Sequence, residues 1–274
     1  MSTALSVPRL SFDEFMAFGR RALGRADVPV VITLPGEFHG HSVVDRLGDM
    51  VVTVFTEPND RRNPLRFRTE EIRLREFFTD QYQRDPGAWH RVVSNLRDNP
   101  ADIDALLGFD AEALFDYRHR LNAANLWISH RGVFTQCHFD ELENFNIALA
   151  GRKRFVMAPP GYADYYPRSL LRGFGDKSQA FDLDDVDPAR FPRLAPKLAQ
   201  RRELILEPGQ MLYLPLGWWH QVESLDELNI NINFWLPDRK IFRRPHVLGV
   251  ALGTVAYRKL KGVYTYKPVK QRAS

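Results

Sequence analysis

The pattern of hydrophobic and polar positions changes character twice along this chain, first close to residue 121 and again close to residue 238. Before the first change, the pattern predicts a helix over 11–24, strands over 28–34 and 50–55, and two or three short helices within 87–120, one of them in GFDAEALFDYRHRL. The first helix has Ser11 as its N-cap, and Glu14 stands where it closes a capping box. We expect residues 1–120 to form strands and helices that pack on the domain that follows.

Residues 121–237 consist of short apolar runs separated by Pro and Gly turns. The predicted strands are NLWISH, QCHFD, NFNIALAG, KRFVMAPP, ELILEPG, QMLYLP, HQVES and NINFWLP. Many short strands with regular turn signals favour a barrel or a sandwich, so the predicted class is mainly β with flanking helices.

The last of these strands has a polar face. Asn229, Asn231 and Asn233 alternate with apolar residues, and strand parity puts Trp235 on the face of the amides. Such a face suits either the lining of a barrel lumen or a half-exposed strand.

A third segment, residues 238–274, combines a helix with a basic tail. Its helix over 246–261 carries an apolar stripe, which we expect either to pack back on the domain or to form a homodimer. The segment has ten Lys and Arg but one acid, so it holds the basic excess of a chain with net charge +4. We interpret this charge as a solvated surface; an acidic partner is the alternative, and nucleic acid is not expected.

The remaining composition limits the classes of protein. The one cysteine, Cys137, excludes an intramolecular disulfide and a cysteine-based zinc site. The N-terminus has no long apolar run of the kind found in signal peptides, and the longest mainly apolar run, 247–257, is too short to span a bilayer. We therefore expect a cytoplasmic protein without a membrane segment.

Candidate chemistry begins with His138 and Asp140, which strand parity places on one face while Cys137 points to the other. An H-x-D pair alone is common by chance. His220 follows a Pro-Gly turn, an apolar strand and a Pro-Leu-Gly corner, and it completes a set of two histidines and one carboxylate. This set is the facial triad of non-haem Fe(II) oxygenases. The GEFHGH segment, with Glu37, is a weaker alternative for metal binding and reads better as a surface loop.

An anionic co-substrate would need partners of its own near such a site. Thr135, Asn144 and Lys153 lie close to the H-x-D in sequence, and a buried ammonium is a good counter-ion for a carboxylate.

Two segments resemble a known family. They are T-x-x-H-F-D-E-x-x-N-F-x-x-x-x-x-G-x-K-R-F-x-x-x-P-P (Thr135 to Pro160) and P-G-Q-M-L-Y-L-P-x-G-W-W-H-Q-V-E-S (Pro208 to Ser224). Both resemble the JmjC/cupin-like Fe(II)- and 2-oxoglutarate-dependent oxygenases. In motif they come closest to the asparaginyl hydroxylase that modifies hypoxia-inducible factor. The resemblance is dense over 122–236 and implies a double-stranded β-helix.

The resemblance also implies roles for individual residues. The iron ligands would be His138, Asp140 and His220; the 2-oxoglutarate contacts would be Thr135, Lys153, Asn144 and Asn233; and the substrate side would hold Trp235 and Trp219. Relatives often use an early tyrosine as a further 2-oxoglutarate contact. Here the segment GAWHRVVSNL offers His90 or Arg91 and no tyrosine.

The function implied is hydroxylation of an unactivated C–H bond in an amino-acid side chain of a peptide, protein or amino-acid-derived metabolite. N-methyl-lysine demethylation by the same chemistry is one alternative. A cupin-like binding protein without activity is the other, and the presence of all three triad residues and Lys153 disfavours it.

Overall fold

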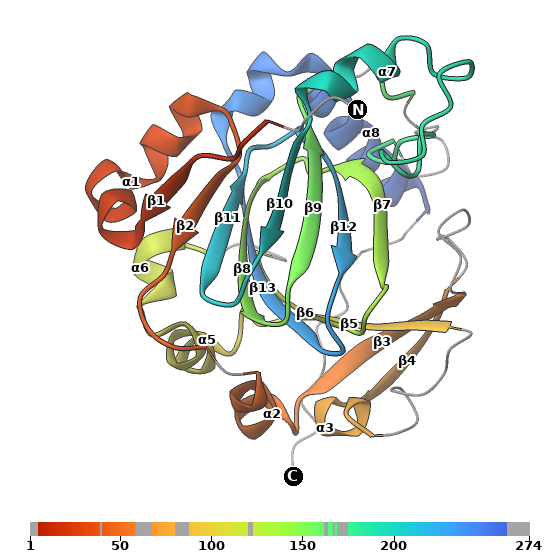
Figure 1. Cartoon of the computed structure of the whole chain (residues 1–274). Helices are drawn as coiled ribbons and strands as arrows, with labels where there is room; N and C mark the ends of the chain where they lie inside the picture. Colours follow the sequence, from red (N-terminus) through yellow and green to blue (C-terminus); the bar gives the residue numbers. More distant parts are fainter. Residues whose placement is uncertain are drawn as a thin grey trace.

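Two β-sheets that face each other make up the body of the protein (Figure 1). The computed structural model describes residues 5–38, 40–58, 67–79, 88–119, 123–161, 164–166, 168 and 175–261. Within these ranges, one sheet has nine strands and the other has four. From β6 to β13 the chain passes repeatedly between the sheets, which is the jelly-roll arrangement and confirms the predicted mainly-β class.

The large sheet combines strands from both halves of the chain. Its order is β1 (Arg9–Ser11), β2 (Val30–Thr33), β11 (Gln210–Leu214), β8 (Glu143–Ala150), β13 (Asn229–Leu236), β6 (Ala124–Ser129), β5 (Ala88–Asn95), β3 (Val51–Pro58) and β4 (Arg68–Arg73). The N-terminal strands therefore extend both edges of this sheet. Two short helices, α5 (Pro100–Leu107) and α6 (Ala111–Phe115), lie within 87–120 as predicted. Residues 88–95, at the start of that range, form a strand that pairs with β3 and β6.

The small sheet has the order β10 (Arg202–Leu206), β9 (Lys153–Ala158), β12 (Trp219–Ser224) and β7 (Phe134–Phe139). All its pairs are antiparallel. The β12–β7 pairing shifts register once: His220 lies opposite His138, but Val222 lies opposite Thr135. Two residues of β7 thus face one residue of β12, which defines a β-bulge.

Three apolar clusters hold the sheets and helices together: one between the two sheets and one on the outer face of each sheet. Phe155 and Met157 of the small sheet meet Leu212 and Leu214 of the large sheet in the space between the sheets. The outer face of the large sheet is covered by helices α1 (Phe12–Ala26), α2 (His41–Leu47), α3 (Leu74–Phe77), α5 (Pro100–Leu107) and α6 (Ala111–Phe115). The outer face of the small sheet is covered by residues 180–198, which include α7 (Leu194–Lys197), and by α8 (Pro245–Lys261).

The ends of the helices follow local sequence signals. The predicted capping box is present at α1, where Ser11 and Glu14 exchange hydrogen bonds, and Gly19 interrupts the helix with a φ of 70°. The helix predicted in GFDAEALFDYRHRL stops early, at Phe115. It stops there because Asp116 takes a left-handed conformation, and the Glu112 side chain accepts hydrogen bonds from the next two backbone N–H groups.

The C-terminal segment is tied to the domain by two of its basic residues. The 3-10 helix η3 (Arg239–Arg243) leads into α8; the other one, η2 (Leu198–Gln200), lies before β10. Lys240 lies 2.7 Å from Glu143, and Arg244 pairs with Asp27. Part of the basic excess therefore serves internal ion pairs. In the described chain, each helix is too short or too polar to cross a lipid bilayer.

Candidate metal centre and acid pocket

The three residues of the predicted triad come together where β7 and β12 lie side by side. His138 and His220 are a directly opposed cross-strand pair, with ring centroids 4.1 Å apart. Asp140 follows the end of β7, and its Oδ2 lies 3.8 Å from Nε2 of His220. One ligand atom from each of the three side chains lies within 4.8 Å of the other two, a spacing that a single metal ion can bridge.

Backbone carbonyl groups orient both imidazoles. Nδ1 of His138 donates to the carbonyl of Gln136 at 2.8 Å, and Nδ1 of His220 donates to that of Trp218 at 3.0 Å. These bonds leave each Nε2 with a free lone pair. Burial lowers the pKa of both rings, and the positive charge of Lys177 lowers it further. Both histidines are therefore neutral at neutral pH, which is the form that binds a metal.

A chain of amides connects the Asp140 carboxylate to Lys153. The Lys153 ammonium donates to Oδ1 of Asn231, whose amide donates to Asn233 at 2.6 Å. Asn233 donates to Asn144 at 3.2 Å, and Asn144 donates to Oδ2 of Asp140 at 2.8 Å. An ammonium only donates and a carboxylate only accepts, so the two ends fix the direction of all four bonds.

The β-bulge brings Thr135 to the face of His138. Three positions separate these residues, so a regular strand would turn their side chains to opposite faces. The extra residue in β7 turns the Thr135 side chain to the face that His138 occupies. Thr135 pairs with Val222 on this inner side of the sheet. The bulge therefore puts a hydroxyl beside the triad.

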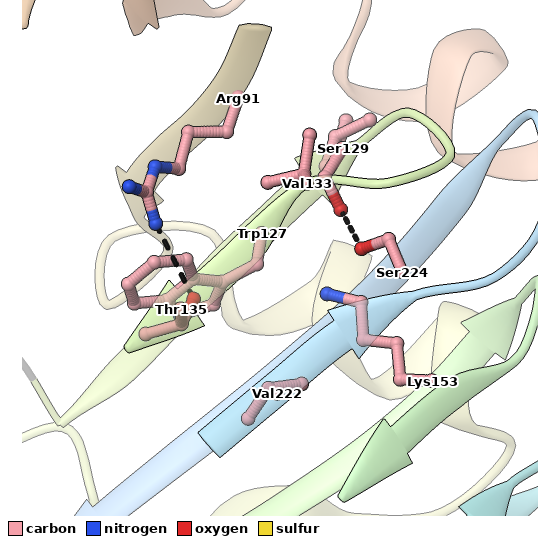
Figure 2. A pocket seen from close by; sticks show the side chains of 9 residues that line it. Arg91, Trp127, Ser129, Val133, Thr135, Lys153, Val222 and Ser224 are labelled. Atoms are coloured by element: carbon pink, nitrogen blue, oxygen red, sulfur yellow. Dashed lines mark hydrogen bonds between the residues drawn. The ribbon is translucent and has the colours of Figure 1, made fainter. Parts of the chain in front are cut away.

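Next to the triad is a pocket lined by Arg91, Trp127, Ile128, Ser129, Val133, Thr135, Lys153, Val222 and Ser224 (Figure 2). Lys153 has 7% of its surface exposed, as the sequence led us to expect. Burial lowers the pKa of its ammonium group to about 7, and the nearby Arg91 adds to this effect. An anion bound in the pocket would therefore stabilise the charged form of Lys153.

The sequence left open whether His90 or Arg91 takes the place of the family's early tyrosine. Arg91 lies on β5 and donates to the Thr135 hydroxyl at 3.4 Å. The neighbouring His90 points to the other face of the strand, where its Nδ1 meets the Thr56 hydroxyl at 3.0 Å. Of the two residues that might stand in for the family's early tyrosine, the structure therefore places Arg91 at the pocket. The alternation of Trp89, Arg91 and Val93 with His90 and Val92 was the available signal for a strand.

The two tryptophans expected at the substrate side lie in different places. Trp235 lies on the inner face of β13, with its ring 6.2 Å from that of Trp127. Trp219 requires a correction: it is fully buried on the outer face of the small sheet, stacks on Tyr165 and donates to the carbonyl of Gly161. It immediately precedes His220, so strand parity turns it away from the site. Cys137 lies on the same outer face, as expected.

Two other groups of residues could in principle bind a metal, and the case for each is weaker than for the triad. Glu37 is described, but His39 and the side chain of His41 lie outside the described residues, so the GEFHGH alternative stays a prediction. Glu112, Asp116 and His119 also bring ligand atoms within 4.8 Å, on the surface. The Glu112 carboxylate already accepts two backbone hydrogen bonds at the end of α6, so this group reads as a helix cap.

The triad fits a divalent metal of the Fe(II) type. Two neutral imidazole nitrogens and one carboxylate oxygen lie close enough together to bind one ion, and three protein ligands leave coordination positions for other molecules. Fold and site together define a jelly-roll protein of the facial-triad class.

Comparison with known proteins agrees with this class. The family model of the cupin-like domain matches residues 20–240, so the chain belongs to the cupin-like family, as the sequence resemblance suggested. This match also confirms the predicted fold.

Relatives carry several names. Human HSPB1-associated protein 1 is 35% identical over 115 residues, which are 41% of this chain and 23% of that protein. Lysine-specific demethylase JMJ31 of Arabidopsis thaliana is 31% identical over 116 residues, 42% of this chain and 21% of the relative. The tRNA wybutosine-synthesizing protein 5 of Gallus gallus is 33% identical over 178 residues, 61% of this chain and 51% of the relative. The chain thus spans between about a fifth and a half of these relatives.

Proposed function

We propose that this protein is an Fe(II)- and 2-oxoglutarate-dependent oxygenase. One observation carries the proposal: a triad of two neutral histidines and an aspartate lies beside a pocket that holds the buried cation Lys153. Membership of the cupin-like family, and the presence of lysine-specific demethylases among the relatives, support it.

Each residue of the site has a task in this mechanism. When bound, Fe(II), 2-oxoglutarate and dioxygen supply the oxidising chemistry that inserts one oxygen atom into a C–H bond. His138, Asp140 and His220 would hold the metal on one side. Lys153 and Thr135 would bind the distal carboxylate of 2-oxoglutarate through charge-assisted hydrogen bonds.

Asparagine side chains would orient the metal-binding carboxylate through hydrogen bonds. Asn144 holds the Asp140 carboxylate, and Asn233 holds Asn144 at the co-substrate end of the lumen.

The test is formation of succinate from 2-oxoglutarate by iron-loaded protein. We expect His138→Ala and Asp140→Ala to abolish it, because each removes a metal ligand. His119→Ala is the matched control: it removes an exposed histidine from the surface Glu112 group and should leave succinate formation unchanged. Wild-type protein that never binds 2-oxoglutarate in the presence of anaerobic Fe(II) would overturn the proposal.

For the substrate, we propose an amino-acid side chain in a peptide, a protein or an amino-acid-derived metabolite, in line with the motif resemblance to the asparaginyl hydroxylase. Demethylation of N-methyl-lysine is a second candidate, favoured by relatives named lysine-specific demethylases. Mass spectrometry separates the two: hydroxylation leaves a product heavier by one oxygen atom, whereas demethylation releases formaldehyde. A cupin-like binding protein without activity would give neither product and no succinate.

Location and assembly are also proposals. A cytoplasmic enzyme fits the single buried cysteine, which needs no oxidising compartment. A homodimer through α8 fits the exposure of Leu252, Val255 and Leu260 on that helix.

A further inference from the structure

Residues 176–178, which lie between β9 and β10 in the sequence, extend the small sheet beyond its edge strand β7. The backbone N–H of Phe139 donates to the carbonyl of Asp176 at 3.0 Å, and the N–H of Ser178 donates to the carbonyl of Cys137 at 3.0 Å. These two hydrogen bonds lie on either side of His138. The segment is therefore fixed to the strand that carries the first metal ligand.

The same segment is also held on its far side. The backbone N–H of Arg168 donates to the carbonyl of Lys177 at 2.8 Å, and the N–H of Gln179 donates to the carbonyl of Tyr166 at 3.0 Å. A side chain that stands on a backbone held from both sides needs little reordering when a ligand binds. Residues 176–178 therefore form a prepared platform next to β7.

Lys177 faces the metal centre from this platform. It is the antiparallel bridge partner of His138. Residues directly opposite each other in an antiparallel pair put their side chains on the same face, so Lys177 shares the face on which the triad lies. Burial is the main cause of the lowered pKa of His138 and His220, and the positive charge of Lys177 lowers the pKa of both rings further. The ammonium group therefore lies close to both imidazoles.

Lys177 forms an ion pair with its neighbour Asp176 on the solvent side of the metal centre. Nζ of Lys177 lies 2.9 Å from Oδ2 of Asp176, and their side chains are 24% and 30% exposed. The side chain of His220, in contrast, is 3% exposed. The negative charge of Asp176 acts against the lowering of the pKa of His220, so this carboxylate also lies near the ring. A molecule that approaches the metal from solvent therefore meets both charges.

A fixed pair of opposite charges suits a ligand that carries the opposite pair. An ammonium has three donors and a carboxylate has about four acceptor positions, so Lys177 and Asp176 can keep each other and still bind a ligand. A ligand with a carboxylate and an ammonium side by side would form two charge-assisted hydrogen bonds with them. A free amino acid has these two groups on one carbon atom, whereas peptide bonds make both neutral.

We propose that Lys177 and Asp176 bind the α-carboxylate and the α-ammonium group of the molecule that is oxidised, and that this molecule is a free amino acid or a small derivative that retains both groups. The inference rests on the proposed function of the same site, and it selects one of the substrate classes named there. Because Lys177 lies opposite His138, a molecule held by the pair lies beside the metal ligands. Lys177 then determines specificity for the substrate, whereas Lys153 serves the co-substrate.

The experiment measures the binding of the standard free α-amino acids to protein loaded with Mn(II) and 2-oxoglutarate. Mn(II) speeds the NMR relaxation of protons that lie close to it, so a titration gives a dissociation constant without turnover. Each amino acid is compared with its N-acetyl methylamide, which keeps the side chain and removes both charges. The variants are Lys177→Gln and Asp176→Asn. The matched control is Lys197→Gln, which changes a lysine that pairs with Asp164 at 3.1 Å. Thermal unfolding and the affinity for 2-oxoglutarate are measured on each protein.

We expect at least one free amino acid to bind, and to bind about tenfold or more tightly than its capped form. Lys177→Gln and Asp176→Asn should each weaken this binding about tenfold, because each removes one charge-assisted hydrogen bond at a partly exposed position. Lys197→Gln should bind as wild type does. Three results would each overturn the inference and leave the oxygenase proposal standing: equal binding of free and capped forms, equal binding by Lys177→Gln and wild type, or no binding of any free amino acid. Failure of the wild type to bind 2-oxoglutarate would instead refute the oxygenase proposal and, with it, this inference.

Discussion

At the scale of single residues, Lys153 shows how burial prepares a binding site. An ammonium group without water around it loses the stabilisation of its charge, and the pKa of Lys153 is therefore lowered to about 7. A carboxylate placed beside it stabilises the charged form and raises that pKa again. Binding of an acid above pH 7 must then take up a proton.

The resulting prediction concerns pH. Free Lys153 is mostly charged below pH 7 and mostly neutral above it, so the affinity for 2-oxoglutarate should fall as pH rises from 7 to 9, by about tenfold or more overall. Calorimetry in buffers of different ionisation enthalpy measures both the affinity and the proton uptake. 2-Oxobutyrate is the control, since its binding does not involve the distal site. A constant affinity for 2-oxoglutarate without proton uptake would contradict the role of Lys153.

At the scale of elements, the turn between β11 and β12 sets where the strand that carries His220 begins. Gly217 has a φ of 78°, and its backbone N–H donates to the carbonyl of Asp140 at 2.8 Å. A Cβ atom there would come within 2.8 Å of Val247 and 3.0 Å of Arg244. The turn thus joins two triad segments at a point where only glycine fits.

Gly217→Ala should therefore destabilise the protein by about 1–3 kcal/mol, through the left-handed backbone and the close contact with α8. Denaturant unfolding monitored by circular dichroism measures this loss. Gly24→Ala in α1 is a matched control, because its added methyl group meets atoms no closer than 3.8 Å and alanine favours a helix. Equal stability of the two variants would show that the turn tolerates a side chain.

The polar face of β13 is a second element with a measurable role. Asn144 contacts Asp140 directly, whereas Asn233 and Asn231 act on it through one and two further amides. Removing a group that orients a metal ligand lowers metal affinity about 10–100-fold.

We therefore expect a graded loss of metal affinity: largest for Asn144→Ala, smaller for Asn233→Ala and smallest for Asn231→Ala. Competition with a metal-sensitive dye, using Mn(II) as the probe, measures the series. Asn95→Ala, at an amide of β5 that lies outside this chain of hydrogen bonds, is the control. Equal losses for all three asparagines would mean that they act by general destabilisation.

At the scale of the whole molecule, α8 divides its apolar stripe between two roles. Val247 and Val250 are buried against the small sheet, so part of the stripe packs on its own domain. Leu252, Val255 and Leu260 are exposed by 62%, 51% and 86%, and a second copy of the helix is the partner that we propose for them.

If this holds, light scattering should give the mass of a dimer for the full chain, and Leu252→Glu/Val255→Glu should give a monomer with unchanged thermal stability. The matched control is Phe242→Glu, which changes an exposed aromatic residue just before α8. A monomeric wild type at micromolar concentration would refute the proposal.

The sequence by itself determined whatever depends on neighbours along the chain. Strand parity put His138 with Asp140 and turned Cys137 away. The alternation in β13 gave a polar face, and the structure turns that face inward. The capping box of α1 is also a local matter, because its hydrogen bonds span three residues. Each of these features follows from the geometry of one element.

Only the tertiary structure decided what depends on pairing between elements. The bulge that turns Thr135 inward arises from the register of β7 against β12, and Arg91 reaches the pocket because its segment became a strand between β3 and β6. No local pattern carries that register, because it is set by which strands find each other across long stretches of chain. The triad itself joins residues about 80 positions apart, and packing of two sheets is what closes that distance.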